Sequence, residues 1–227
     1  FLFAGDQKME HLNADFYGQD IPDVCNNPQH LFTIASKAPV GCFATHLGLL
    51  ARHGHQHTNV PYIIKLNGKT NLYDGEPHSH SLHSVTDVVD FAHASQLPIA
   101  GIGYTVYLGS AHEGAMLQQA AQHVLHAHQH GLVAILWIYP RGKSVKDPHH
   151  ANMLAGAAGV AASLGADFVK VALGTSDNPG EQSQALRQAV GAAGTTGVIC
   201  AGGSAMDPEI FLTHVHAQLS IAGSRGI

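Results

Sequence analysis

The chain has 227 residues, of which 45% are apolar, and a formal net charge of -5 at pH 7 with only 11 Lys and Arg residues. No basic run occurs, which argues against nucleic acid as a partner, and no apolar run approaches the roughly 18 residues of a membrane helix. The length suits one α/β barrel, a fold that runs to about 250 residues as a single domain, so we expect one domain over residues 1–227.

The cysteines and the first residues of the chain indicate the cellular compartment in which the protein works. Cys25, Cys42 and Cys200 are odd in number and widely spaced, which indicates reduced thiols in a cytoplasmic protein rather than a disulfide framework. The apolar stretch 1–4 is short and lacks a basic leader, so it predicts a strand rather than a signal peptide.

Nineteen histidines are an unusual number, and many of them gather in short polar tracts. Their polar neighbours favour the protein surface over a metal site, and many of the histidines would gain charge between pH 7 and 5. A histidine-rich metal-binding protein therefore remains an alternative without enzymatic activity. The tracts are 53–57, 78–83 and 123–130.

Apolar runs and helical periodicity alternate along the chain. Between them lie a long loop over 9–29 and a polar, irregular stretch over 68–83. Helices are expected at 28–35, 46–52, 84–94, from Ser110 to Gly131, and at 152–164, 181–193 and 208–218. Strands are expected at 1–7, 40–45, 61–67, 99–107, 132–140, 165–173, 197–202 and 219–223.

Eight strands that alternate with helices predict a (β/α)8 TIM barrel, with a doubly wound sheet as the alternative. The chain stops just after the eighth expected strand, where a complete barrel would continue into an eighth helix. We therefore expect the last helix to be absent and the sequence to be truncated at both ends.

One strand carries a residue that does not suit a buried strand. Lys170 lies between Val169 and Val171, and removing an ammonium from water is unfavourable. Burial lowers the pKa of a lysine, and a neutral amine is the nucleophile that Schiff-base chemistry requires. The alternative is an edge lysine whose ammonium reaches solvent.

In a barrel, catalytic residues come from the carboxyl ends of the strands. That rule selects Trp137 and Tyr139, which share one side of their strand, and Asp6 after the first strand. Core packing would also explain Trp137 and Tyr139, and a turn or cap would explain Asp6. The same rule also selects Thr45, Lys65, Asn67 and Lys170.

Two glycine-rich stretches follow the seventh and eighth expected strands. TIM barrels often bind phosphate with the backbone N–H groups of these two loops. We therefore predict a sugar-phosphate site there, although two tight turns would explain the glycines as well. The residues are Gly202, Gly203 and Ser204 in the first stretch, and Gly223, Ser224 and Arg225 in the second.

These motifs together resemble the archaeal-type class I fructose-bisphosphate aldolases, within a broad family of aldolases and thiolase-like enzymes. The resemblance runs nearly from end to end of the chain. The stretches that carry it are 4–13, 65–72, 103–110, 127–132, 136–143, 165–171 and 200–204.

The resemblance implies a cytoplasmic glycolytic and gluconeogenic lyase that cleaves fructose 1,6-bisphosphate reversibly into dihydroxyacetone phosphate and glyceraldehyde 3-phosphate. Lys170 matches the imine-forming lysine, Tyr139 the acid/base tyrosine, Trp137 its neighbouring tryptophan and Asp6 the first-strand aspartate. The resemblance places the phosphates at Gly203, Ser204, Gly223 and Arg225. It further implies no cofactor, no metal, a phosphorylated sugar as substrate, no nucleic acid or membrane partner, and a ring-based homo-oligomer such as a decamer.

Other activities remain open at this point. A metal-dependent aldolase or isomerase on the same barrel is motivated by the histidines. A related Schiff-base aldolase or thiolase-like enzyme would act on another phosphorylated sugar or ketone.

Overall fold

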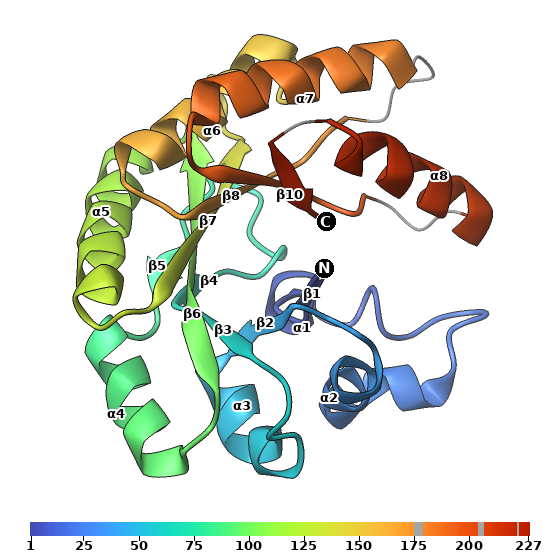
Figure 1. The fold of residues 1–227 in the computed structure, drawn as a ribbon, viewed down its shortest axis with the longest axis vertical. Helices are drawn as coiled ribbons and strands as arrows, with labels where there is room; N and C mark the ends of the chain where they lie inside the picture. Colours follow the sequence, from blue (N-terminus) through green and yellow to red (C-terminus); the bar gives the residue numbers. More distant parts are fainter. Residues whose placement is uncertain (175–178, 204–206, 222) are drawn as a thin grey trace. The chain divides into compact units, whose positions relative to one another are not determined.

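A computed structural model describes residues 1–174, 179–203, 207–221 and 223–227 (Figure 1). The strands are β1 (Leu2–Ala4), β2 (Cys42–His46), β3 (Tyr62–Lys65), β4 (Asn67–Gly68), β5 (His80–Ser81), β6 (Ile99–Leu108), β7 (Val133–Pro140), β8 (Phe168–Val171), β9 (Gly197–Cys200) and β10 (Ser224–Gly226). The helices are α1 (Gln7–Glu10), α2 (Pro28–Lys37), α3 (Leu47–His53), α4 (Val85–Ser95), α5 (Glu113–Gln129), α6 (Ala151–Ser163), α7 (Pro179–Ala193) and α8 (Pro208–Leu219), with short 3-10 turns at Asp23–Asn26 and Gly54–Gln56.

One sheet contains eight strands in the order β1-β2-β3-β6-β7-β8-β9-β10, which is also their order along the chain. The pairs β1–β2, β2–β3, β3–β6, β7–β8, β8–β9 and β9–β10 are parallel. A doubly wound sheet reverses its strand order at a switch point, and this sheet does not. The predicted (β/α)8 topology is therefore confirmed, and the doubly wound alternative is wrong.

The chain divides into two units, and the first comprises residues 1–75, 79–104 and 126–133. Its core contains a cluster of aromatic rings from α2, β2 and β3, in which Phe32, Phe43 and Tyr62 pack with centroids 5.0 to 6.1 Å apart. All three side chains are fully buried. Burial on both faces explains the consecutive apolar residues 43–44 of β2 and 62–64 of β3, as is typical of parallel strands.

Two predicted helix starts in this unit are confirmed by their caps. Asn27 accepts a hydrogen bond from the backbone N–H of Gln29, and Pro28 occupies the first helical position. Ser84 and Asp87 form a reciprocal capping box at the start of α4.

The stretch 68–83 is less irregular than its composition predicted. Asn67 and Gly68 pair with Ser81 and His80 in the short antiparallel β4–β5 ladder. Two-residue strands are too short to produce a hydrophobic alternation, which is why the sequence pattern missed them.

The second unit comprises residues 76–78, 105–125 and 134–227. It contains β7, in which residues 134–138 are buried, as the apolar run predicted. Small residues on α6 allow close packing, and Ala157, Ala158 and Ala161 are completely buried.

The eighth strand lies later than predicted. Residues 219 and 220 complete the last turn of α8, since Ser220 donates its backbone N–H to the carbonyl of His216. Gly223 then turns the chain with φ +91°, and β10 begins at Ser224. The buried Ile221 made the stretch look like a strand, but it anchors the end of a helix instead.

No helix within the described ranges is long and apolar enough to cross a membrane. This finding agrees with the absence of long apolar runs in the sequence.

A substitution at Gly101 tests the packing between β6 and the start of β7. A Cβ atom there would lie 2.2 Å from the backbone oxygen of Val133, which cannot move aside as a flexible side chain can. We expect Gly101→Ala to reduce the free energy of unfolding by about 2–3 kcal/mol, measured by urea denaturation. Gly156→Ala on α6 is the control, because its Cβ would meet open space and should leave stability equal or about 0.5–1 kcal/mol higher.

Candidate active site

Lys170 and Trp137 occupy directly opposed positions on the neighbouring parallel strands β8 and β7. The Lys170 Nζ lies 5.7 Å from the centroid of the Trp137 ring, near the outer limit of a cation–π contact. Trp137 itself is only 2% exposed, so the ring is a fixed surface against which the lysine side chain lies. The parallel register brings these two predicted site residues together.

Lys170 is partly buried, which corrects the expectation of a fully buried strand lysine. Along β8 the residues alternate, with Val169 and Val171 completely buried and Phe168 and Lys170 partly accessible. The alternation follows from the period of two in a strand, so the two flanking valines did not determine the environment of the lysine.

Tyr139 follows Trp137 by two positions on β7 and is partly buried. It lines a cavity of about 210 Å³ together with Arg141, His149 and Ala172. The opening beyond the end of β7 and β8 leaves room for a ligand beside the phenol. Tyr139 is therefore placed, as predicted, at the carboxyl end of its strand.

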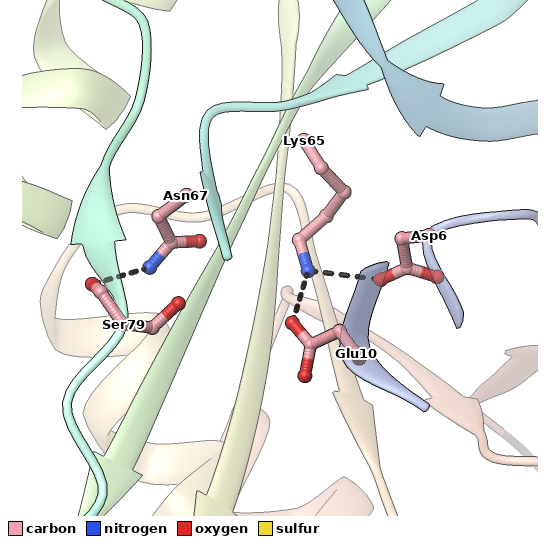
Figure 2. A network of polar contacts seen from close by, with 5 residues as sticks. All are labelled: Asp6, Glu10, Lys65, Asn67 and Ser79. Atoms are coloured by element: carbon pink, nitrogen blue, oxygen red, sulfur yellow. Dashed lines mark hydrogen bonds and ion pairs between the residues drawn. The ribbon is translucent and has the colours of Figure 1, made fainter. Parts of the chain in front are cut away.

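Asp6 belongs to the first unit, where it joins a buried charge cluster shown in Figure 2. The Lys65 Nζ donates to Asp6 Oδ2 at 2.9 Å and lies 3.9 Å from Glu10 Oε1. The Lys65 side chain is only 1% exposed, compared with 10% for Asp6 and 18% for Glu10. We call these three residues the charge cluster.

The sequence placed Lys65 among the residues at the carboxyl ends of the strands but gave it no role, and it did not point to Glu10. The signal for Lys65 was the same as for Lys170, a lysine within an apolar strand. In the structure Lys65 is almost fully buried, as are Tyr62, Ile63 and Ile64 before it.

Polar groups next to the charge cluster hold the β4–β5 ladder in place (Figure 2). Asn67 donates from Nδ2 to the backbone oxygen of Ser79 at 3.0 Å, and both residues are fully buried. Burial raises the pKa of Tyr104, whereas its side-chain hydrogen bonds with Ser81 and Asn67 act in the opposite direction. A neutral phenol therefore secures the polar stretch at the carboxyl end of β3.

His46 is the one buried histidine of the nineteen, all of which the structure describes, and it is only 6% exposed. Desolvation by burial is the main cause that lowers its pKa to about 4, followed by the charge of Lys65, while Asp6 acts to raise it. Its ring is therefore neutral at pH 7. The other histidines are partly or fully exposed, which confirms the surface placement predicted for the tracts.

The two predicted phosphate stretches differ in the structure. Gly202 and Gly203 are exposed directly after β9, and Gly203 has φ +79°. Ser204 lies outside the described residues. The second stretch is not a loop after the eighth strand, because Gly223 precedes β10 while Ser224 and Arg225 lie within it.

No three His, Cys, Asp or Glu side chains gather as a metal site in the part of the chain that the structure describes. The cysteines there, Cys25, Cys42 and Cys200, are all unpaired thiols, and burial raises the pKa of Cys200 to about 11.

Comparison with known proteins decides the family. The model of the DeoC/LacD family of aldolases matches residues 1–227. The chain belongs to the DeoC/LacD family of aldolases.

Individual aldolases align over almost the whole chain. A fructose-bisphosphate aldolase/6-deoxy-5-ketofructose 1-phosphate synthase of Methanocaldococcus jannaschii is 53% identical over 99% of this chain and 72% of its own length. The structure of a fructose-bisphosphate aldolase from Slackia heliotrinireducens gives a TM-score of 0.93 at 46% identity, covering 99% of this chain and 72% of that one.

An archaeal fructose-1,6-bisphosphate aldolase with its catalytic lysine covalently bound to the carbinolamine intermediate gives a TM-score of 0.84 at 31% identity. It covers 99% of this chain and 83% of that chain. The resemblance to archaeal-type class I fructose-bisphosphate aldolases is thus confirmed, as is the fold, and this DeoC/LacD aldolase is a lyase.

The buried His46 of this aldolase should make folding sensitive to acid. Its pKa is about 4 in the folded protein against 6.5 for an ordinary histidine, so the unfolded chain takes up the proton first as the pH falls. The free energy of unfolding therefore falls as the pH drops from 6.5 to 4. His46 accounts for a loss of about 2 kcal/mol at pH 5 relative to pH 8.

Urea denaturation at pH 8 and pH 5 measures this loss. We expect His46→Gln to reduce the difference between the two pH values by about 2 kcal/mol, while the exposed-residue control His126→Gln leaves it unchanged. An equal pH dependence in all three proteins would contradict the role of His46.

Proposed function

We propose that this aldolase cleaves fructose 1,6-bisphosphate reversibly through an imine on Lys170. The observation that carries the proposal is the placement of Lys170 directly opposite Trp137 on neighbouring strands, with Tyr139 two positions further along the same strand. The archaeal aldolase whose lysine carries a covalent carbinolamine supports the same chemistry.

The reaction begins when the neutral Lys170 amine attacks the ketone carbon of the open-chain sugar. Loss of water gives a protonated imine, which accepts the electron pair of the bond between the third and fourth carbons. Tyr139, as its phenolate, takes the proton from the hydroxyl on the fourth carbon, so that this carbon leaves as the aldehyde of glyceraldehyde 3-phosphate. Tyr139 then returns this proton to the third carbon of the enamine, and water hydrolyses the resulting imine to dihydroxyacetone phosphate and the free amine.

The other predicted residues position the sugar and keep water away from the amine. Trp137 shapes the pocket beside the Lys170 amine and excludes water from it. Asp6 orients the hydroxyl groups of the sugar and assists imine formation. The backbone N–H groups of Gly202 and Gly203, with Ser204, are assigned to a phosphate, since N–H groups at such loops suit an anion. A phosphate-binding role is also proposed for the second stretch, Gly223, Ser224 and Arg225. Gly223 precedes β10, and the other two residues lie within it.

Because the imine accepts the electron pair, the proposed reaction needs neither a metal nor another cofactor. We further propose that the enzyme acts in glycolysis and gluconeogenesis in the cytoplasm, and that it forms a homo-oligomer. The unpaired cysteines support a reducing compartment.

A second activity has a specific motive in the bifunctional relative from Methanocaldococcus jannaschii. Breaking the corresponding bond in 6-deoxy-5-ketofructose 1-phosphate gives dihydroxyacetone phosphate and 2-oxopropanal. Both activities would therefore use the same imine on Lys170 and differ in the aldehyde, which carries a phosphate in one case and a methyl ketone in the other.

Removing the amine tests the central step. We expect Lys170→Met to reduce kcat/KM for cleavage of fructose 1,6-bisphosphate by roughly four orders of magnitude, because no imine can form. Lys146→Met, which removes an exposed lysine of the loop after β7, is the control and should leave kcat/KM unchanged. Activity that survives in Lys170→Met would refute the proposal.

Dialysis against EDTA separates this mechanism from a metal-dependent aldolase. We expect cleavage activity to be retained in full, since the imine replaces the metal as electron acceptor. Loss of activity in EDTA that added zinc restores would favour the metal-dependent alternative.

The two aldehydes discriminate between the substrate assignments. With dihydroxyacetone phosphate as donor, we expect faster condensation with glyceraldehyde 3-phosphate than with 2-oxopropanal, measured by consumption of the donor. A preference for 2-oxopropanal would assign the second activity to this enzyme, and Lys170→Met should abolish both reactions.

A further inference from the structure

The charge cluster contains two carboxylates and one ammonium in a place almost closed to water. An ammonium that is 1% exposed is tolerated only when opposite charge and hydrogen bonds replace its hydration. Asp6 supplies a charge-assisted hydrogen bond at 2.9 Å, and Glu10 supplies a second negative charge at 3.9 Å. The cluster therefore carries one more negative charge than positive charge when all three groups are ionised.

Lys65 contacts carboxylates at both ends of the single helical turn α1. Asp6 immediately precedes α1 and Glu10 is its last residue, so the two carboxylates are four positions apart and project on the same side. Lys65 reaches both from the end of β3 (Figure 2). This contact fixes the direction of the Asp6 carboxylate at the carboxyl end of β1.

Two other ionisable side chains lie close to the cluster within the described part of the first unit, His46 and Lys8. His46 lies at the end of β2. Burial, followed by the charge of Lys65, lowers its pKa to about 4, so its ring is neutral above about that pH. Lys8 on α1 instead donates to the backbone oxygen of Asn26 and lies over the ring of Phe16. Lys65, unlike Lys8, donates a hydrogen bond directly to the Asp6 carboxylate.

We propose that Lys65 is a positioning residue for Asp6, which it keeps ionised and aimed in one direction, and that Glu10 holds Lys65 in place. The proposal rests on the proposed function, in which Asp6 orients the hydroxyl groups of the sugar. Lys65 acts through Asp6 and does not contact the substrate, because its side chain is almost completely enclosed.

Replacing Lys65 by a neutral residue removes the ammonium that lies next to both carboxylates. One of them then takes up a proton at a higher pH, or the turn of α1 moves to separate them. Replacing Glu10 by Gln has the opposite effect, because it removes the like charge next to Asp6 and leaves the Lys65–Asp6 pair intact.

A double-mutant cycle tests the proposal with kcat/KM for fructose 1,6-bisphosphate, measured from pH 5 to 9. The proteins are the wild type, Asp6→Asn, Lys65→Gln and the double variant, with the exposed Lys37→Gln as control. We expect the double variant to be within about threefold of Asp6→Asn, because residues that act as a unit are not additive. Independent roles would instead multiply the two single losses and overturn the proposal.

The acid limb of the pH profile supplies a readout that a purely structural role would not move. We expect this limb to shift to higher pH by about one unit in Lys65→Gln, to return in Lys65→Arg, and to shift to lower pH in Glu10→Gln. A loss of thermal stability with an unchanged acid limb would overturn the proposal. If Lys65→Gln does not fold, the direction of the shift in Glu10→Gln decides.

The two proposals fail in different ways. If Lys170→Met retains the wild-type activity, the proposed function fails and the role of Lys65 falls with it. If Lys170→Met is inactive but the cycle is additive, only the positioning role of Lys65 is refuted.

Discussion

The first unit is built around a lysine ammonium that has almost no contact with water. Such a charge is stable only if its partners are held at fixed distances, so Asp6 and Glu10 must stay where Lys65 reaches them. This requirement connects the end of β1, the single turn of α1 and the end of β3. The neighbouring His46 adds no positive charge, since burial and the charge of Lys65 keep its ring unprotonated at neutral pH.

The second unit satisfies a different constraint, that of register between parallel strands. Side chains at paired positions of β7 and β8 lie side by side, so the pairing of Trp137 with Lys170 follows directly from the ladder. The aromatic ring is fixed by burial, while the lysine remains partly accessible. An amine that must meet a substrate needs this accessibility, which a completely enclosed lysine such as Lys65 lacks.

The sequence predicted most elements because apolar runs and caps are local signals. Asn27, Ser84 and Gly131 marked helix ends correctly, and Gly131 adopts φ +69° as a residue after a helix often does. The strand expected at 219–223 was wrong because one buried residue, Ile221, resembles a strand when its partners are unknown. The short β4–β5 ladder depends on tertiary hydrogen bonds that leave no periodic trace.

Site prediction was less complete for a related reason. A lysine in an apolar strand signals burial or function, and the sequence contains two of them, Lys65 and Lys170. Only the structure distinguishes the enclosed lysine, which is paired with carboxylates, from the partly accessible one beside a tryptophan. The partnership of Asp6, Glu10 and Lys65 joins residues up to 59 positions apart, which no local pattern reveals.

The most direct test of the imine mechanism is reductive trapping. The protein is incubated with dihydroxyacetone phosphate and sodium borohydride, digested, and analysed by mass spectrometry. The mechanism predicts one stable adduct, located on the peptide that contains Lys170 and absent without the ketone. No adduct, or an adduct on any other lysine, would contradict it.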